Sequence, residues 1–227
     1  LENAQLTKEV VINVVSHAIV EQTSLSSTEY EAGVNEFVKA GFTPIASDLV
    51  KPFRVKESPV QMECIVKEIV SLGDEGGAGN LVICEIVKMH VSESILNDQQ
   101  QIDPHKIDLV GRMGANWYCR ASGESVFEVL KPNSKIGIGY DQLPARIRNS
   151  FILSGNDLAK LANFGKIPSA ELVEIFKENT DIANLLEAGN DDEETREELH
   201  KHAKTLLENN KVEAAWKTLL IDKLNRL

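Results

Sequence analysis

The sequence of 227 residues contains little cysteine, few aromatic residues and little positive charge. Its cysteines, Cys64, Cys84 and Cys119, lie far apart, and no CxxC pair or Cys/His spacing typical of a metal site is present. Two of them fall in apolar runs that resemble strands, where reduced, buried thiols are common. A chain of this length can bury a sizeable core without a disulfide or a structural metal. We therefore expect reduced cysteines, no metal ligands and a cytoplasmic location.

Positive charge is scarce, since 24 Lys and Arg stand against 35 Asp and Glu, for a formal net charge of −11. Proteins that bind nucleic acid without sequence preference neutralise its phosphates with lysine and arginine, so this balance argues against a nucleic-acid partner. A cofactor that carries phosphate remains compatible with the composition, because a helix N-terminus can hold phosphate without a basic surface.

Long apolar runs and common catalytic motifs are also missing. No apolar run approaches the roughly 18 to 20 residues of a membrane-spanning helix, and no cationic stretch precedes an apolar one at the N-terminus. The glycine-rich segment 73–80 is not a phosphate loop, because Asn80 stands where that motif has lysine and a strand-like run follows. Neither paired carboxylates nor a Ser/His/Asp set stands out. We expect no membrane partner.

The first part of the sequence has the patterns of β-strands. Residues 10–15 form a β-branched run that predicts a strand buried on both faces. Residues 58–72 alternate in polarity, with a phase slip at Lys67 that predicts a β-bulge. The glycine-rich turn 73–80 leads into a second long strand over 81–92. Two long strands across such a turn predict an antiparallel hairpin, the basis of a barrel or sandwich.

Shorter elements follow this hairpin. The Asp103-Pro104 pair, an N-cap followed by proline, predicts a short helix that ends near Val110. Residues 117–120 and 126–130 have the composition of two further short strands.

After about residue 140 the composition changes, and apolar residues recur at helical spacing. We therefore expect two regions, a mainly β domain over residues 1–140 and a helical extension over 141–227. Residues 187–198 hold seven carboxylates and one arginine. We favour an exposed, acidic helix start for this run, which suits the helix dipole. A docking surface for a basic partner is the alternative.

Several motifs occur in order between residues 41 and 120. They are GFTP at 41–44, VKPFRV at 50–55, ESPV at 57–60, EC at 63–64, GGAGNLVICE at 76–85, HV at 90–91 and VGRMGANWY at 110–118. In this order they resemble the flavin reductase-like, FMN-binding split-barrel family, in the branch of flavoredoxin and the flavin reductase component of nitrilotriacetate monooxygenase. The resemblance implies a mainly β, antiparallel split β-barrel with short helices. It also implies a homodimer with each FMN in a groove between subunits.

The resemblance also bears on the start of the sequence. In this family an N-terminal segment with early barrel strands and a phosphate-binding threonine precedes the position of Leu1. We therefore expect those strands to lie outside these 227 residues, and the helical extension to lie outside the shared domain.

The function implied by the resemblance is transfer of a hydride from NAD(P)H to FMN, in an NAD(P)H-dependent flavin reductase. An electron-acceptor protein or a monooxygenase would then be a partner. The alternative is a non-enzymatic FMN-binding electron carrier of the flavoredoxin type. A third interpretation makes the barrel a scaffold for a partner-binding tail.

The resemblance implies cofactor-binding roles for five residues and assigns no catalytic residue. They are Asn80, His90, Arg112, Trp117 and Tyr118. Asn80 stands where many small flavin reductases have a Gly-Asp-His sequence, and it is also typical of a plain turn. His90 can equally be a half-exposed strand histidine, and Arg112 can pair with a surface carboxylate. Trp117 and Tyr118 can be core or dimer contacts.

Overall fold

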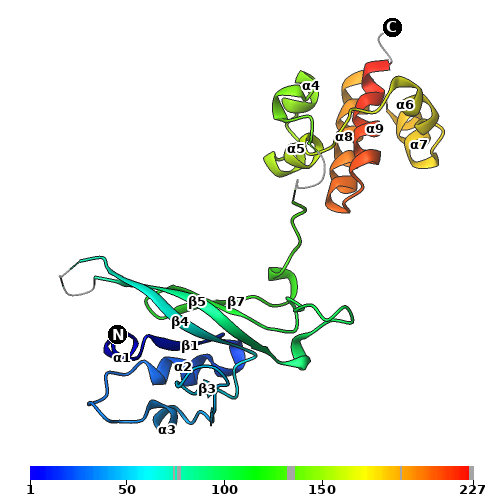
Figure 1. The fold of residues 1–227 in the computed structure, drawn as a ribbon. Coiled ribbons are helices and arrows are strands. Elements are labelled where there is room, and N and C mark those ends of the chain that lie inside the picture. Colours follow the sequence, from blue (N-terminus) through cyan, green and yellow to red (C-terminus); the bar gives the residue numbers. More distant parts are fainter. Residues whose placement is uncertain (74, 76–77, 132–135, 190, 225–227) are drawn as a thin grey trace. The chain divides into compact units, whose positions relative to one another are not determined.

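The computed structural model describes residues 1–73, 75, 78–131, 136–189 and 191–224. Its contacts divide the chain between Glu128 and Val129 into two compact units. We call residues 1–128 the N-terminal unit and residues 129–227 the helical unit, and each is described by itself. Figure 1 shows the labelled strands in the first and the helices α4 to α9 in the second.

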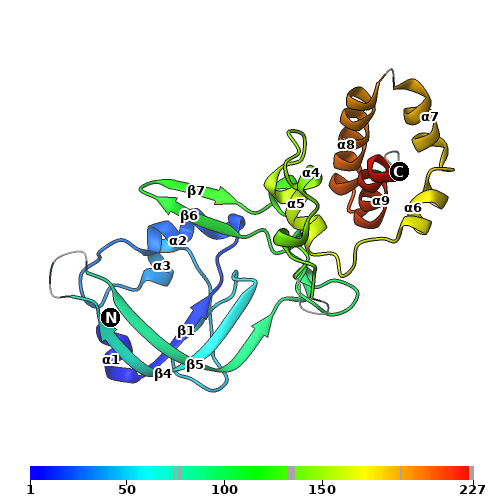
Figure 2. The same ribbon diagram turned by 90° about the horizontal axis from the view of Figure 1, so that it is seen from above.

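A three-stranded antiparallel sheet forms the centre of the N-terminal unit. Its order is β1 (Glu9–Asn13), β4 (Val60–Ser71) and β5 (Asn80–Val91), which lie side by side in Figure 2. The predicted hairpin of β4 and β5 is confirmed. The predicted bulge is confirmed between Val66 and Glu68, and a second register shift lies between Glu63 and Cys64. Residues 74, 76 and 77 of the glycine-rich turn lie outside the described residues.

The burial predicted for the first strand is wrong. Among the described residues, β1 pairs with β4 alone, and Ile12 in β1 is 44% exposed. The strand with buried side chains on both faces is instead β4, over residues 60–66, where the loop that carries Asp48 bonds to Glu63 on one face. Val60, Cys64 and Glu63 are all buried there, although Glu63 belongs to the polar phase of the alternation.

Short helices and strands precede, separate and follow the three strands of this sheet along the chain. Two two-residue strands, β2 and β3, pair antiparallel around the loop from Ala46 to Phe53. The helix α3 ends at Gly41, whose φ of 70° is a left-handed conformation that glycine adopts without strain. The bounds of these elements are α1 (Glu2–Thr7), η1 (His17–Ile19), α2 (Val20–Ser26), α3 (Glu36–Ala40), β2 (Pro44–Ile45), β3 (Arg54–Val55), η2 (Glu93–Ile95) and η3 (Gly123–Ser125).

The helix predicted from Asp103 is absent. The Asp103 side chain accepts the His105 N–H, and the Asp103 backbone carbonyl accepts the Ile107 N–H. The chain therefore makes a single turn there and does not continue as a helix. It then enters a second hairpin, of β6 (Val110–Gly114) and β7 (Trp117–Arg120). The strand predicted at 117–120 is thus confirmed, whereas residues 126–130 form no strand.

The fold class needs correction on two points. All strand pairs are antiparallel, as expected, but the described residues form no closed barrel. Helices also occupy more of the described chain than strands do, so "mainly β" fails for the whole chain. The helical unit accounts for most of that difference.

The helical unit has its own core. Trp216, Ile147 and Leu161 are fully buried in it, and the indole N–H of Trp216 donates to the Leu161 carbonyl at 3.1 Å. No helix in the described part of the chain is long and apolar enough to cross a membrane. The helices are η4 (Tyr140–Gln142), α4 (Ala145–Arg148), α5 (Gly155–Ala162), α6 (Ala170–Phe176), α7 (Thr180–Ala188), α8 (Asp192–Glu208) and α9 (Val212–Leu224).

Candidate functional site

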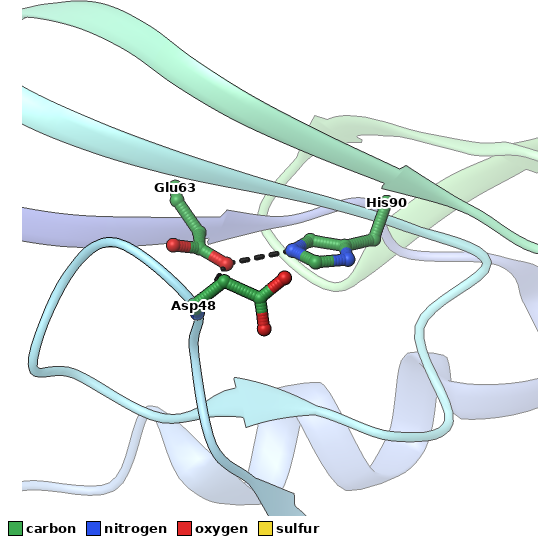
Figure 3. A group of neighbouring side chains, drawn as sticks. All are labelled: Asp48, Glu63 and His90. Carbon is green, nitrogen blue, oxygen red and sulfur yellow. Dashed lines mark hydrogen bonds and ion pairs between the residues drawn. The ribbon is translucent and has the colours of Figure 1, made fainter.

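A buried carboxylate organises the polar face of the central sheet. The Glu63 side chain, in the middle of β4, is 0% exposed. Its oxygens accept the backbone N–H groups of Asp48 at 2.9 Å, Leu49 at 2.6 Å and Val50 at 3.2 Å. These amides belong to the loop between β2 and β3. The carboxylate therefore fastens that loop to the sheet. Figure 3 shows Asp48, from this loop, beside Glu63.

Two side chains with N–H groups also approach Glu63. His90 Nε2, from β5, lies 2.6 Å from Oε1, and Arg54 Nε, from β3, lies 3.9 Å from the same oxygen. Burial alone would raise the pKa of the Glu63 carboxyl. The backbone N–H groups of the loop and the His90 ring outweigh burial and lower that pKa to about 2. Glu63 is therefore ionised at neutral pH.

The ionised Glu63 carboxylate determines which nitrogen of the His90 ring carries a proton. Because a carboxylate only accepts hydrogen bonds, Nε2 must carry a proton in the bond that Figure 3 draws. In the neutral ring, Nδ1 is then the free acceptor. The contact therefore orients His90 and leaves one ring nitrogen for a ligand.

Asp48 lies close to the same pair of side chains. Ligand atoms of Asp48, Glu63 and His90 all fall within 4.8 Å of one another. Asp48 forms an ion pair with Lys88, and the hydrogen bond from that lysine lowers the pKa of the Asp48 carboxyl. Both oxygens of Glu63 already accept N–H donors. We therefore interpret the group as a satisfied hydrogen-bond network that anchors the loop, rather than as a metal centre.

His90 also lines a polar cleft of about 500 Å³ in the N-terminal unit. Three permanent cations line it as well, Arg54, Lys56 and Lys106. Polar side chains supply most of the remaining surface. They are Ser16, Ser58, Gln61, Ser92 and Ser94, together with the carboxylates Glu57 and Asp108.

A second cleft, of about 440 Å³, is mostly apolar. Phe37, Phe42 and Phe53 line it, together with Val55 and the amide of Asn13. The Asn13 side chain accepts the Val55 N–H at 3.0 Å, so it also holds β3 near β1. The N-terminal unit thus offers one cleft suited to charged groups and one suited to a flat apolar group.

The structure separates two of the five predicted site residues. Asn80 is the first residue of β5 and His90 the eleventh. At about 3.3 Å per residue they lie roughly 33 Å apart along the strand. One small ligand cannot contact both side chains within a single chain.

The other three predicted residues lie together on one hairpin. Arg112 on β6 is opposite Tyr118 on β7, and Trp117 is 76% exposed. Arg112 donates to the Ala115 carbonyl at 3.2 Å, within the same hairpin. None of the three lines either cleft. Their role in cofactor binding stays a prediction.

Sequence reasoning missed the residues that the structure gathers around His90. Glu63, Arg54 and Asp48 were not candidates, although the first two fall within the motifs or strand patterns that the sequence displays. One usable signal was present. Gln61 and Glu63 are polar residues in a strand that is otherwise apolar, and a polar group in a central strand requires a partner.

Comparisons with known proteins find similarity to the N-terminal unit. Residues 1–104 match the flavin reductase like domain family. An uncharacterized protein of Aquifex aeolicus is 33% identical over 129 residues, which are 57% of this chain and 64% of that protein. The matched segment thus spans less than two thirds of this relative.

Two solved structures are similar as well. Nitrilotriacetate monooxygenase component B from Bacillus cereus is 25% identical, with a TM-score of 0.51 over 56% of this chain and 63% of its own. A protein with a split barrel domain from Shewanella frigidimarina, assigned as a flavin reductase, is 28% identical, with a TM-score of 0.50 over 57% of this chain and 64% of its own. Residues 1–104 therefore match the flavin reductase like domain, and the N-terminal unit is similar in fold to these two solved structures, one of which has a split barrel domain.

Proposed function

We propose that this protein binds FMN and transfers a hydride from NAD(P)H to the flavin. The observation that carries the proposal is the family match over residues 1–104. In such proteins the cofactor performs the redox chemistry, and the protein supplies binding, orientation and electrostatics. The proposal therefore requires no general acid, base or metal in the N-terminal unit.

The two clefts fit the chemistry of this cofactor. A flavin mononucleotide combines a flat aromatic ring system with a polyol chain and a phosphate. Phe37, Phe42 and Phe53 line a cleft suited to the ring. The lysines, the arginine and the serines of the polar cleft suit the chain and the phosphate. Apart from Lys106, these side chains lie within residues 1–104, the part of the chain that matches the family model.

The proposal also covers the location, the oligomeric state, the cofactor contacts and the partner of the protein. The protein would act as a cytoplasmic homodimer, and Asn80, His90, Arg112, Trp117 and Tyr118 would contact the cofactor. Because Asn80 and His90 lie at opposite ends of β5, they would serve two different sites or two different parts of the assembly. A monooxygenase is the proposed partner, since one similar structure is component B of such an enzyme.

The test is an absorption spectrum followed by a turnover assay. Purified protein is incubated with FMN, passed through a desalting column and scanned, and retained oxidised flavin is expected. NADH and NADPH oxidation is then measured with added FMN against the same flavin without protein. Absence of both retained flavin and turnover would overturn the proposal. Retained flavin without turnover would favour the electron carrier instead.

A pair of variants tests the hairpin residues. Trp117→Ala removes an exposed aromatic ring from the proposed site, and Phe151→Ala removes an exposed ring from the helical unit as the control. If Trp117 stacks on the flavin, FMN should bind about three- to tenfold more weakly to Trp117→Ala, since such a contact contributes about 0.5–1.5 kcal/mol. Equal affinities of the two variants would remove Trp117 from the site.

A further inference from the structure

We propose that Glu63 is a positioning residue for the apolar cleft, because it fixes the loop that places Phe53 in the cleft wall. This loop is the segment from Ala46 to Phe53, between β2 and β3. The Glu63 side chain is fully buried and lines neither cleft. The inference rests on the proposed function, in which the flavin ring binds in the apolar cleft, and it assigns to that site a residue that the ligand does not touch.

Carboxylates of the central sheet hold this loop through its backbone. The N–H groups of residues 48–50 donate to Glu63 on β4. The next N–H group, that of Lys51, donates to Glu9 Oε2 on β1 at 2.7 Å. Four consecutive backbone donors are thus accepted by side chains of two neighbouring strands. The course of the loop therefore depends on acceptors that lie on the sheet, and Glu63 supplies most of them.

Two further contacts join the ends of the loop. The Ser47 hydroxyl donates to the Pro52 carbonyl at 2.5 Å. Outside that bond, Ile45 on β2 pairs with Arg54 on β3. Phe53 lies between these two contacts in the chain. Its position therefore depends on a loop that is joined at its ends and anchored to the sheet in its middle.

The end of the loop supplies part of the wall of each cleft. Pro52 and Phe53 line the apolar cleft, and Arg54, the next residue, lines the polar cleft. Phe53 is 56% exposed, so packing of its own side chain contributes little to its position. The backbone anchor at Glu63 is therefore the main contact that keeps the Phe53 ring in the wall of the apolar cleft.

Anchoring of the loop affects ligand affinity through conformational entropy. A loop that is free before binding must be ordered when a ligand contacts it, and each ordered backbone residue costs free energy. Because Glu63 orders the loop in the unbound protein, a flat ring meets a wall that is already formed. Without the anchor, ordering of the loop becomes part of the binding step, and the affinity for the ring falls.

Glu63 also contacts His90, which lines the polar cleft, so a substitution of Glu63 can reach the ligand by a second route. The two routes are separable, because only one of them passes through Phe53. In a double-mutant cycle, an effect that acts through Phe53 disappears once Phe53 is replaced. An effect that acts through His90, or through the stability of the whole unit, persists in that background.

The test is such a cycle, with FMN binding to the full chain measured by equilibrium dialysis. Phe53→Ala should weaken binding about three- to tenfold, as expected for the loss of one aromatic contact. Glu63→Gln should weaken it about tenfold, which is the effect of ordering about one backbone residue on binding. The double variant should bind about as weakly as the weaker of the two single variants, whereas independent effects would multiply to about 30- to 100-fold. Circular dichroism checks that each variant is folded.

Two more variants complete the design. Glu68→Gln is the matched control, because Glu68 is an exposed glutamate on β4, and it should bind FMN as the wild type does. Glu9→Ala serves if Glu63→Gln does not fold, since it removes the acceptor of the Lys51 N–H and leaves Glu63 in place. It should weaken FMN binding about threefold, because one of the four backbone donors loses its acceptor. This effect should disappear in the Phe53→Ala background.

The outcomes separate this inference from the proposed function. Loss of affinity in the anchor variants that disappears in the Phe53→Ala background supports the inference. If the folded anchor variants or Phe53→Ala bind FMN as tightly as the wild type, the inference fails and FMN binding stands. The same holds if the effects of an anchor variant and of Phe53→Ala multiply. If the wild type binds no FMN, the proposed function fails, and the inference fails with it.

Discussion

Replacing Glu63 with glutamine tests whether one buried carboxylate fastens the loop between β2 and β3 to the sheet. Glutamine has nearly the same shape, but one carboxylate oxygen becomes an NH2 group. On the Oε2 side, that group would face the Leu49 and Val50 N–H donors instead of accepting from them. On the Oε1 side, it would face the Asp48 N–H and the His90 ring. Either orientation leaves donors opposed to donors in a site that water does not reach.

The size of the effect follows from the pKa of Glu63. That pKa falls from 4.5 to about 2 in the folded protein. A shift of one unit corresponds to about 1.4 kcal/mol, so the ionised carboxylate stabilises the fold by about 3 kcal/mol at pH 7. We expect Glu63→Gln to lower the free energy of unfolding by about that amount. A loss of one or two charge-assisted hydrogen bonds has a similar size.

The pH dependence has a definite sign. Because the folded pKa lies below the unfolded value of 4.5, the stabilisation is fully present above pH 4.5. It decreases as the pH falls through about 2, and near pH 3 it should be about half of its value at pH 7. The difference in free energy of unfolding between the wild type and Glu63→Gln should therefore become smaller at acidic pH.

Urea denaturation and amide hydrogen exchange measure these effects. Denaturation is followed by far-UV circular dichroism at pH 7 and near pH 3. Exchange is followed at the amides of Asp48, Leu49 and Val50, which should lose protection in Glu63→Gln. The matched control is Glu68→Gln, because Glu68 is an exposed glutamate on the same strand. Unchanged stability together with unchanged protection of the three amides would refute the anchoring role.

Two further predictions concern the helical unit. Ser154→Ala should lower its free energy of unfolding by about 1 kcal/mol, because Ser154 caps α5 through the Asp157 N–H. Ser169→Ala is the control, since Ser169 precedes α6 without a side-chain capping bond; equal effects in urea denaturation would contradict the capping argument. A fragment of residues 129–227 should be helical and unfold cooperatively on heating, because its core cluster contains residues of that unit alone. A fragment without helical circular dichroism would show that the unit requires the rest of the chain.

Local chemistry made several elements predictable. The hairpin of β4 and β5 depends on neighbouring residues, namely two alternating runs and a glycine-rich turn. The start of α5 depends on Ser154 and Asp157, which lie three positions apart and form a capping box. The pair Asp103-Pro104 was misleading, because an N-cap pattern sets the first turn but not its continuation. In the structure the chain makes that turn and then joins β6.

The site required contacts between residues that are distant in sequence. Glu63 belongs to the polar phase of β4, so its side chain was expected on a face of the sheet that is exposed to solvent. Glu63 is buried because the loop with Asp48 folds over it, and these two residues are 15 positions apart. His90 joins them from β5, 27 positions after Glu63. No local pattern encodes such a contact.

The resemblance to the flavin reductase-like family, the main hairpin and the helical character of the second region could all be recognised from the sequence alone. Ordered motifs, alternation and helical spacing are properties of neighbouring residues, and their physical causes act locally. Three-dimensional contacts were needed to show that β4 is the buried strand, that Glu63 orients His90, and that lysines from two separate segments, Lys56 and Lys106, line one cleft. Burial and electrostatic contact depend on which segments meet in space, and a pattern within one segment does not specify its partners.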